Sequence, residues 1–462
     1  MVSSAGEGID AADIQKKERV KARWGLLRQA LLGNDTTNCN ASNTNHKGRF
    51  SNEHSMNSFP GFKVLDRTIL PNNDKNNNID DNWDIIQYSY TTSNGHTIQF
   101  TTREAKEQQP TNEQKTTIQS RVEALLSHRT HGVDNTGNVR VWDAELTLAG
   151  FLLSTMLNGD NDTVLELDEQ TDAQLANLRN SLHSILNIED GKTEDQTICN
   201  VLELGAGQAG LAGLALASAA SRSCTSCTED SNIPTKPLHV VLTDGHPKCV
   251  ENNRVCAKML SSESSDSRAA QCIDTHLLLW DSSKKGVDAC NEINNLVKEE
   301  TSQKKSTDEG RYHICLVSDC VHFQEFNGGL LLTIARTLTI NGIALLCQPR
   351  RGTSLQNFMK MVDTVNQKAM QQIEDTTNQS AINGPLFQMT LYEHFYPKVS
   401  KMHKSLILSG DTTNDTKQCT SPRYNPNWHQ PLLLVLQKLR PYSEEVDGEV
   451  ARQHMLTCSC RK

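Results

Sequence analysis

A glycine-rich turn is the segment whose spacing most directly suggests ligand binding. The segment VLELGAGQAG, from Val201 to Gly210, places Gly205, Gly207 and Gly210 after a predicted strand and before a predicted helix. Glycines in such a turn let the backbone pass close beneath a ligand, and the free N–H groups of the helix point toward it. On spacing alone, the G-x-G-x-x-G pattern predicts a dinucleotide such as NAD.

Glu203, at the end of the strand, favours a different ligand. A pyrophosphate is dianionic, so a carboxylate at the mouth of its cradle is unfavourable. S-adenosylmethionine has no phosphate and carries an ammonium and a sulfonium group, which a neighbouring carboxylate attracts. We therefore predict S-adenosylmethionine as the cofactor, with NAD as the alternative.

Acidic and aromatic side chains end the next two predicted strands. Asp244, followed by Gly245, ends the strand in VVLTDGHPKCVENN. Its carboxylate is placed either to accept both ribose hydroxyls of a nucleoside or to cap the following helix. Trp280 and Asp281 end the strand in LLLWDSS, and the pair offers an apolar face and a hydrogen-bond partner to an adenine, although a core position also explains the tryptophan.

The strand in VSDCVHF brings three further reactive side chains, Asp319, Cys320 and His322, to the same predicted edge. A substrate amine must be neutral to attack a sulfonium, and burial beside a cationic donor lowers the pKa of that amine. Asp319 is predicted to hold the amine, and His322 is a candidate general base or else an exposed loop histidine. Direct methyl transfer needs no covalent intermediate, so Cys320 is placed with the cofactor-binding residues rather than as a nucleophile.

Composition excludes several classes of protein. The formal net charge is -9, from 46 Lys and Arg against 55 Asp and Glu, which argues against generic binding to nucleic acid or anionic membrane. The acidic start MVSSAGEGIDAAD has no signal-peptide pattern, so we expect a soluble intracellular protein. The 14 cysteines are then expected to be reduced, and no metal is predicted; zinc at the Cys224–Cys227 and Cys458–Cys460 pairs is the alternative.

Predicted strands and helices alternate from Val139 onward, which indicates an α/β fold with a largely parallel sheet covered on both faces. Strands are predicted at Cys199–Leu204, His239–Thr243, Ile273–Trp280, His313–Ser318, Ile343–Cys347, Phe387–Tyr392 and Leu432–Leu436. Helices are predicted at Asp143–Leu157, Leu211–Ser218, Val250–Met259, Gly329–Leu338 and Leu355–Val365.

The remaining sequence is predicted to extend or decorate this domain. Residues 1–130 form an N-terminal α+β extension with a basic amphipathic helix over Asp13–Leu32, a hairpin over Trp83–Thr101 and a helix over Ile118–Leu126; residues 131–440 form the catalytic domain and residues 441–462 a tail. Polar, disordered insertions that bury little are predicted at Asn158–Lys192, Arg222–Lys236, Ser261–Arg268, Ser282–Gly310, Glu374–Asn383 and Gly410–Pro422.

Several motifs, taken in order, resemble the calmodulin-lysine N-methyltransferase family of class I methyltransferases. They are RWGLLRQ, DNTGNVRVWDAELTLAGFLL, VLELGAGQAGLAGLALA, VVLTDGHPKCVENN, LLLWDSS, VSDCVHF, QPRRGTSLQNF and WHQPLLLVLQK. The resemblance implies a seven-stranded methyltransferase fold with a reversed final strand. It also implies trimethylation of one calmodulin lysine, in the cytoplasm and nucleus.

The resemblance also assigns roles to individual residues. The cofactor pocket is then lined by Trp142, Glu203, Gly205, Gly207, Asp244 and Trp280, while Asp319 and the Arg350–Arg351 pair face the substrate. One departure is His322, at a position where related enzymes carry an aromatic residue. It affects the predicted shape of the lysine channel and the degree of methylation.

An acidic substrate such as calmodulin requires local positive patches on this acidic chain. Candidates are Arg350, Arg351, Lys398, Lys401, His403, Lys404 and the basic helix around Trp24. Trp24 is a substrate-binding candidate because a basic amphipathic helix with an aromatic anchor resembles a calmodulin target, or else it packs on the catalytic domain. A lysine of another protein, such as a chaperone or elongation factor, and a non-catalytic cofactor-binding module are the alternative functions.

Overall fold

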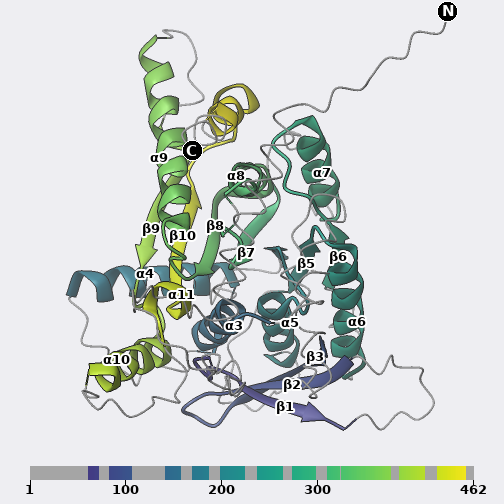
Figure 1. Cartoon of the computed structure of the whole chain (residues 1–462). Coiled ribbons are helices and arrows are strands. Elements are labelled where there is room, and N and C mark those ends of the chain that lie inside the picture. Colours follow the sequence, from purple (N-terminus) through teal and green to yellow (C-terminus); the bar gives the residue numbers. More distant parts are fainter. Residues whose placement is uncertain are drawn as a thin grey trace, which may run out of the picture. The chain divides into compact units, whose positions relative to one another are not determined.

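Leucine- and valine-rich segments form a seven-stranded central sheet in the computed structural model (Figure 1). Its strands are β4 (Cys199–Leu204), β5 (Leu238–Asp244), β6 (Ile273–Leu277), β7 (Tyr312–Ser318), β8 (Leu338–Gln348), β9 (Phe387–Tyr392) and β10 (Leu432–Lys438). The structure describes residues 61–71, 83–106, 141–157, 169–186, 198–223, 237–263, 273–297, 310–322, 324–375, 384–411 and 424–453. All of these belong to one compact unit formed by Gly61–Glu107, Thr130–Asp415 and Tyr424–Lys462.

The strand order is β6-β5-β4-β7-β8-β10-β9. Strand β10 runs antiparallel to both β8 and β9, and the other neighbouring strands are parallel. The order reverses between β4 and β7, and in such sheets ligands bind at the carboxyl ends of the strands beside that reversal. The predicted α/β architecture, a seven-stranded and largely parallel sheet with its final strand reversed, is confirmed.

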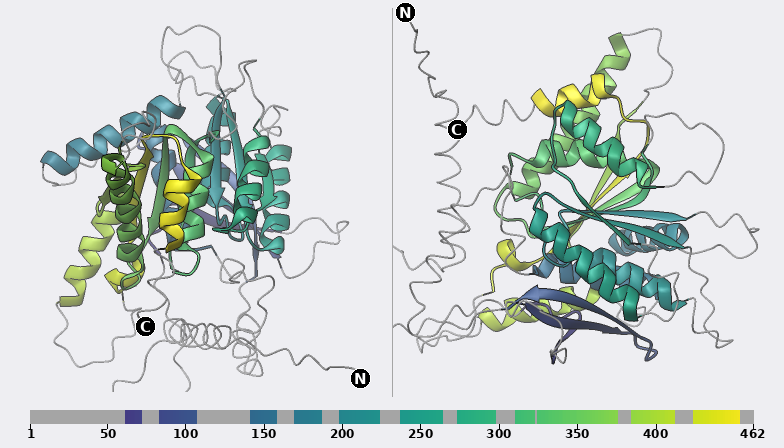
Figure 2. Two further views of the ribbon diagram at one scale, coloured as in Figure 1. Left: turned by 90° about the horizontal axis from the view of Figure 1, so that it is seen from above. Right: turned by 90° about the vertical axis from the view of Figure 1, so that its right-hand side faces the viewer.

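Helices cover both faces of the sheet, as the continuous apolar runs of its strands require. One face carries α3 (Asp143–Met156), α5 (Leu211–Ser223) and α6 (Pro247–Glu263), and the other carries α7 (Lys284–Asn295), α8 (Asn327–Thr337) and α9 (Ser354–Asp375) (Figure 2). All six residues of β4 are buried between these layers. Because β4 is buried on both faces, its position in the sheet is fixed, and so is the position of the glycine-rich turn that follows it at the sheet edge.

A smaller antiparallel sheet packs on the α5–α6 side. It consists of β1 (Asp66–Leu70), β2 (Trp83–Thr91) and β3 (Thr97–Ala105), and the β2–β3 pair confirms the predicted hairpin. Arg103 of β3 donates from Nε to Oδ1 of Asn252 on α6 at 2.6 Å. Ser218 of α5 donates to the carbonyl of Gln99 at 2.9 Å. The division of the chain at residues 130 and 440 stays a prediction.

The prediction of polar insertions that bury little was wrong for two segments, because each contains a helix with buried residues. The Asn158–Lys192 segment includes α4 (Glu169–Leu186), whose Leu175, Leu178, Leu182 and Leu186 are buried. Their spacing of three to four residues places them on one face of a helix. This periodicity is hard to recognise in the sequence because the residues between them are polar. The Ser282–Gly310 segment includes α7, whose Ile293 is fully buried.

Other boundaries also differ from the prediction. Strand β6 ends at Leu277 rather than Trp280, because its neighbour β5 ends at Asp244, whose carbonyl accepts the N–H of Leu278. The unpredicted elements α10 (Pro397–Asp411) and α11 (Pro426–His429) connect β9 to β10, and a π-helical turn (Glu444–Gly448) follows β10.

Some predicted features lie outside the described residues: the helices around Trp24 and over Ile118–Leu126, and the cysteine pairs 224–227 and 458–460. Within the described ranges, no helix is long and apolar enough to cross a membrane.

Candidate active site

The glycine-rich turn has the strained backbone that only glycine adopts readily. Gly205, Gly207 and Gly210 have φ values of 68°, 58° and 54°. A Cβ on Gly205 would lie 2.6 Å from Sγ of Cys320 and 3.0 Å from the ring of Trp280. The turn is therefore packed directly against side chains that follow β6 and β7, at the carboxyl edge of the sheet.

Replacing Gly205 by alanine is expected to weaken cofactor binding about tenfold and to destabilise the fold by about 1–3 kcal/mol, because overpacking adds to the cost of a positive φ. Gly95→Ala is the matched control, since Gly95 has a φ of 82° but nothing within 4 Å of an added Cβ. This control measures the cost of a positive φ without the cost of overpacking. Thermal unfolding and cofactor titration of both variants are the measurements, and equal losses in both would contradict this account of the turn.

Asp244 fastens the turn to the start of α6. Its Oδ2 accepts the N–H of Gly207 at 2.9 Å, and its Oδ1 accepts the N–H of His246 at 2.7 Å. The helix-capping role is therefore present in the structure. The thiol of Cys249 also hydrogen-bonds to this carboxylate, which leaves one of its four lone pairs to accept a ribose hydroxyl. Burial raises the pKa of Asp244 to about 6, with the two backbone hydrogen bonds opposing the shift.

Glu203 lies beneath the turn rather than at its open mouth. It is 1% exposed, and its Oε2 accepts the N–H of Gly213, in the first turn of α5, at 2.8 Å. Its Oε1 is buried without a hydrogen-bond partner. Burial raises the pKa of Glu203 to about 7, against the opposing hydrogen bonds from Gly213 and Ala212.

These contacts decide between the two cofactors considered from the sequence. A pyrophosphate needs the free N–H groups of the turn and of the following helix. Here carboxylates already accept the N–H groups of Gly207 and Gly213, and those carboxylates repel a second anion. The arrangement therefore disfavours binding of a dinucleotide phosphate.

The segment after β6 places Trp280 against the glycine-rich turn. The Nε1 of Trp280 is buried without a hydrogen-bond partner, so an adjoining polar ligand atom would satisfy it. Asp281, predicted to contact adenine, accepts the N–H of Ser283 on its Oδ1 at 2.7 Å, and its contact with adenine stays a prediction.

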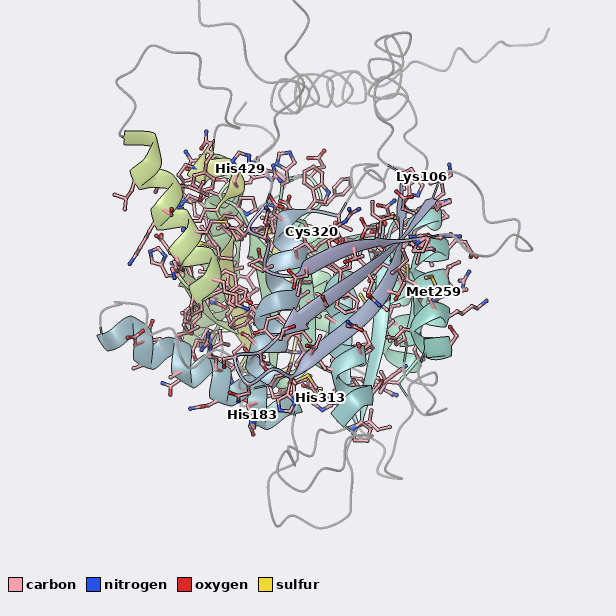
Figure 3. The ribbon with its side chains drawn as sticks, turned by 90° about the horizontal axis from the view of Figure 1, so that it is seen from below. Lys106, His183, Met259, His313, Cys320 and His429 are labelled. Atoms are coloured by element: carbon pink, nitrogen blue, oxygen red, sulfur yellow. The ribbon has the colours of Figure 1, made fainter. Side chains whose placement is uncertain are left out.

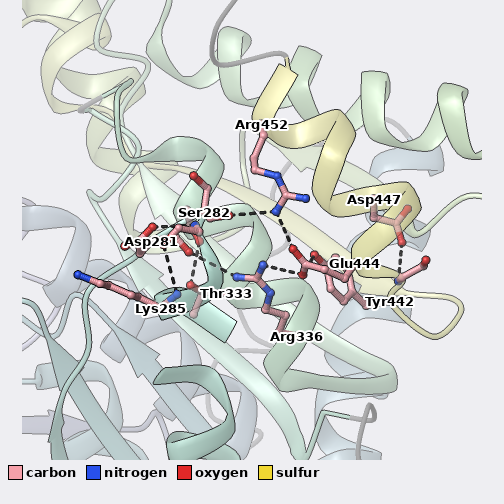
Figure 4. A network of polar contacts seen from close by, with 12 residues as sticks. Asp281, Ser282, Lys285, Thr333, Arg336, Tyr442, Glu444, Asp447 and Arg452 are labelled. Carbon is pink, nitrogen blue, oxygen red and sulfur yellow. Dashed lines mark hydrogen bonds and ion pairs between the residues drawn. The ribbon is translucent and has the colours of Figure 1, made fainter. Parts of the chain in front are cut away.

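Backbone carbonyls of this segment accept from two arginines that converge on one glutamate (Figure 4). Arg336 donates to the carbonyl of Asp281 at 3.4 Å, and Arg452 donates to that of Ser282 at 3.0 Å. Both arginines also pair with Glu444, at 2.7 and 2.6 Å. The segment beyond β10 thus helps to hold the loop that carries Trp280.

A buried ion pair joins the ends of β7 and β8. Arg351 contacts both carboxylate oxygens of Asp319, with Nε at 2.9 Å from Oδ1 and Nη2 bonded to Oδ2. The two side chains are only 12% and 10% exposed, and the guanidinium lies 5.4 Å from the ring centroid of Trp142. Asp319 and Arg351 have φ values of 52° and 44°, and backbone strain of this kind concentrates at functional sites.

The structure separates the members of the predicted Arg350–Arg351 pair. Arg350 extends to the surface and bonds to Glu393 at 2.5 Å, whereas Arg351 turns inward to Asp319. Cys320 donates to the carbonyl of Ser318 at 3.1 Å, and burial raises the pKa of its thiol well above the ordinary value. It is therefore a neutral packing group, in keeping with its exclusion as a nucleophile. His322 lies in the same loop and is half-buried, and Gly245 lies in the turn between Asp244 and α6.

Residues with no predicted role also shape the site. Asn252 and Asn253 of α6 donate to the carbonyls of Gln208 and Gly207 at 2.7 and 3.2 Å, so they hold the turn from the helix side. Glu145 of α3 is 3% exposed, and burial and the charge of Glu203 raise its pKa well above the ordinary range. The signal available in the sequence was the adjacent Asn-Asn of VENN, eight and nine residues after the strand-end acid Asp244.

The side chains at the turn fit S-adenosylmethionine. The glycine cradle admits close backbone approach, Glu203 and Asp244 suit a ligand with cationic groups, and Trp280 offers an aromatic surface with an unsatisfied donor. Among the described residues, no group of three or more His, Cys, Asp or Glu side chains is placed to bind a metal ion.

No protein-family model matches the sequence. An S-adenosylhomocysteine-bound methyltransferase from Thiobacillus denitrificans is 13% identical with a TM-score of 0.25, over 63% of this chain and 97% of that one. A putative rRNA methylase from Clostridium thermocellum is 11% identical with a TM-score of 0.27, over 60% and 100%. A phosphoethanolamine N-methyltransferase from Haemonchus contortus is 13% identical with a TM-score of 0.26, over 64% and 58%. Similarity this low decides nothing about function, which rests on the topology and the site.

Proposed function

We propose that this chain is an S-adenosylmethionine-dependent protein-lysine N-methyltransferase whose substrate is calmodulin, acting in the cytoplasm and nucleus. The observation that carries the cofactor proposal is the pair of carboxylates on the glycine-rich turn. Glu203 and Asp244 accept the N–H groups that a dinucleotide phosphate would need. The same two carboxylates favour a ligand with an ammonium and a sulfonium group.

The cofactor, when bound, supplies an electrophilic methyl group on its sulfonium. Asp244 would accept a ribose hydroxyl, and the buried carboxylate of Glu203 would act on the cationic groups of the ligand through the turn rather than by direct contact. The substrate lysine must arrive neutral, because direct transfer would use its amine lone pair to form the C–N bond while the methyl–sulfur bond breaks. Arg351 uses one lone pair on each oxygen of Asp319, and the remaining lone pairs can accept from the approaching amine.

Calmodulin as the substrate is supported by the motif order of the sequence, from RWGLLRQ to WHQPLLLVLQK. The trimethylation of a single lysine belongs to the same proposal. Transfer to a lysine of another protein keeps every cofactor contact described above and is the alternative. A non-catalytic module is less well supported, because the strained Asp319–Arg351 pair has no use in cofactor binding alone.

The experiment is to incubate the purified chain with tritiated S-adenosylmethionine and unmethylated calmodulin, beside whole-cell extract that lacks the enzyme. Label on a calmodulin lysine supports both the class and the substrate. Label only on another extract protein discards calmodulin, and measurable cofactor binding without label on any protein contradicts the enzymatic proposal.

Cofactor affinity is expected to rise with pH. Because burial raises the pKa of Glu203 to about 7 and that of Asp244 to about 6, both are partly protonated in weak acid. The cationic cofactor prefers their ionised forms, and its own α-ammonium stays protonated below about pH 8. Binding should therefore tighten about 10- to 100-fold from about pH 5.5 to pH 7.5 and release protons.

Calorimetric titration in two buffers of different ionisation enthalpy measures both the affinity and the proton release.

The stability of the free protein has the opposite dependence on pH. Groups with a raised folded pKa stabilise the fold while protonated, so their contribution is lost as the pH rises from about 4 to about 7. A cofactor affinity that is independent of pH, with no proton release, would contradict the assigned charges.

A further inference from the structure

An exposed basic face of α10 lies beside the candidate active site. Strands β8 and β9 both run antiparallel to β10, so β9 ends at the same sheet edge as β4, β7 and β8. Helix α10 follows β9 directly, and α11 then leads back into β10 (Figure 1). The helix therefore leaves and rejoins the sheet at the edge that carries Asp319 and the glycine-rich turn.

The exposed side chains of α10 form one stripe. Lys398, Lys401, Lys404 and Leu408 are exposed and recur at intervals of three, three and four residues, which places them on one side of a helix. Lys398 is at the edge of this stripe, with its Nζ 4.6 Å from the ring centroid of Tyr90. Leu408 is 68% exposed and the neighbouring Ile407 is 44% exposed. From Pro397 to Leu408 the sequence has no acidic residue, although the whole chain has a net charge of -9.

The opposite face of α10 is linked to the candidate active site through contacts with Tyr424 and α11. Nδ1 of His403 lies 2.6 Å from the hydroxyl of Tyr424, whose ring is stacked on His429 with centroids 5.8 Å apart. Asn427 of the intervening α11 accepts the N–H of Arg351 at 2.8 Å. Figure 3 shows His429 and Cys320 at the same end of the sheet, away from His313. Because His403 is buried, it belongs to this anchor and not to the basic surface predicted from sequence.

We propose that the Lys398–Lys401–Lys404–Leu408 face of α10 is a docking surface for an acidic protein substrate with an exposed apolar side chain. This inference rests on the proposed function and names where its protein partner binds. A second copy of the chain fits poorly, because a symmetric contact would set lysines against lysines. Nucleic acid also fits poorly, because exposed Leu408 and Ile407 have nothing to contact on a phosphate backbone.

The test uses the full chain, calmodulin as the acidic probe, and the double variant Lys401→Glu/Lys404→Glu. We expect KM for calmodulin to rise at least about tenfold, because reversal replaces attraction by repulsion at two positions. The kcat and the cofactor affinity should stay within about twofold, and the salt dependence of KM should largely disappear. Leu408→Ala should raise KM about threefold without changing the salt dependence.

The matched controls are Lys258→Glu on α6 and Lys360→Glu on α9, which are exposed lysines on other helices. A similar rise in KM for these controls, or an unchanged KM for the double variant, would overturn the docking surface while leaving the methyltransferase proposal intact.

Direct binding of calmodulin, measured by fluorescence anisotropy, separates the two failures. Binding that depends on α10 without methyl transfer supports the docking surface and discards calmodulin as the substrate. No binding to the wild-type chain overturns both.

Discussion

Asp244→Ala is expected to abolish cofactor binding within the measurable range, with a loss of at least about 100-fold in affinity. The variant removes an ionised acceptor for a ribose hydroxyl, and a hydrogen bond to a charged group contributes about 1.5–3 kcal/mol. It also releases the N–H groups of Gly207 and His246, so the cradle loses its link to α6. Equilibrium titration with S-adenosylhomocysteine measures the affinity.

Asp274→Ala is the control for this variant. Asp274 lies on β6, pairs with His239 at 2.8 Å and is 56% exposed, so its removal should leave cofactor affinity within about twofold. Circular dichroism and thermal unfolding establish that Asp244→Ala still folds. A folded Asp244→Ala protein that binds the cofactor as the wild type does would discard the ribose role and leave only the cap.

Asp319→Asn is expected to lower kcat at least about 100-fold while cofactor affinity changes by less than about threefold. Asparagine tolerates the positive φ of this position, so the backbone is preserved, but Arg351 loses its charged partner in a buried site. Misplacing a positioning group by about 1 Å costs on the order of 100-fold in rate. Single-turnover methyl transfer measures kcat without contributions from product release.

Asp447→Asn tests whether loss of any buried ion pair has this effect. Asp447 makes a bidentate contact with Arg440, at 2.6 and 2.9 Å, and is fully buried. Breaking either pair is expected to destabilise the fold by about 3–5 kcal/mol, and only Asp319→Asn should also lower kcat in the folded protein. Equal effects of the two variants on kcat would remove Asp319 from the active site.

The parallel sheet could be predicted from sequence because its signals are local. The strand Cys199–Leu204 is predicted with the bounds that the structure shows, since a mostly apolar run ends at glycines. Strand-end acids such as Asp244 could be placed at the sheet edge because parallel strands share one direction. Helix α4 was missed because only four of its eighteen residues are buried leucines, and polar residues dominate its composition.

Contacts between distant residues had no signal in a single sequence. Asp319 and Arg351 are 32 positions apart, and their pairing depends on where β7 and β8 end in the sheet. Arg351 was therefore predicted to face the substrate, without its link to Asp319. The inward orientation of Glu203 and the role of Asn252 likewise follow from helix packing, which periodicity does not specify.

The most direct test of the central claim is a pair of calorimetric titrations of the wild-type chain, one with S-adenosylmethionine and one with NAD. Carboxylates on the N–H groups of Gly207 and Gly213 predict binding of S-adenosylmethionine in the micromolar range or tighter, and no detectable binding of NAD. Binding of NAD, or no binding of S-adenosylmethionine by folded protein, would contradict the assignment of the turn and the methyltransferase function that rests on it.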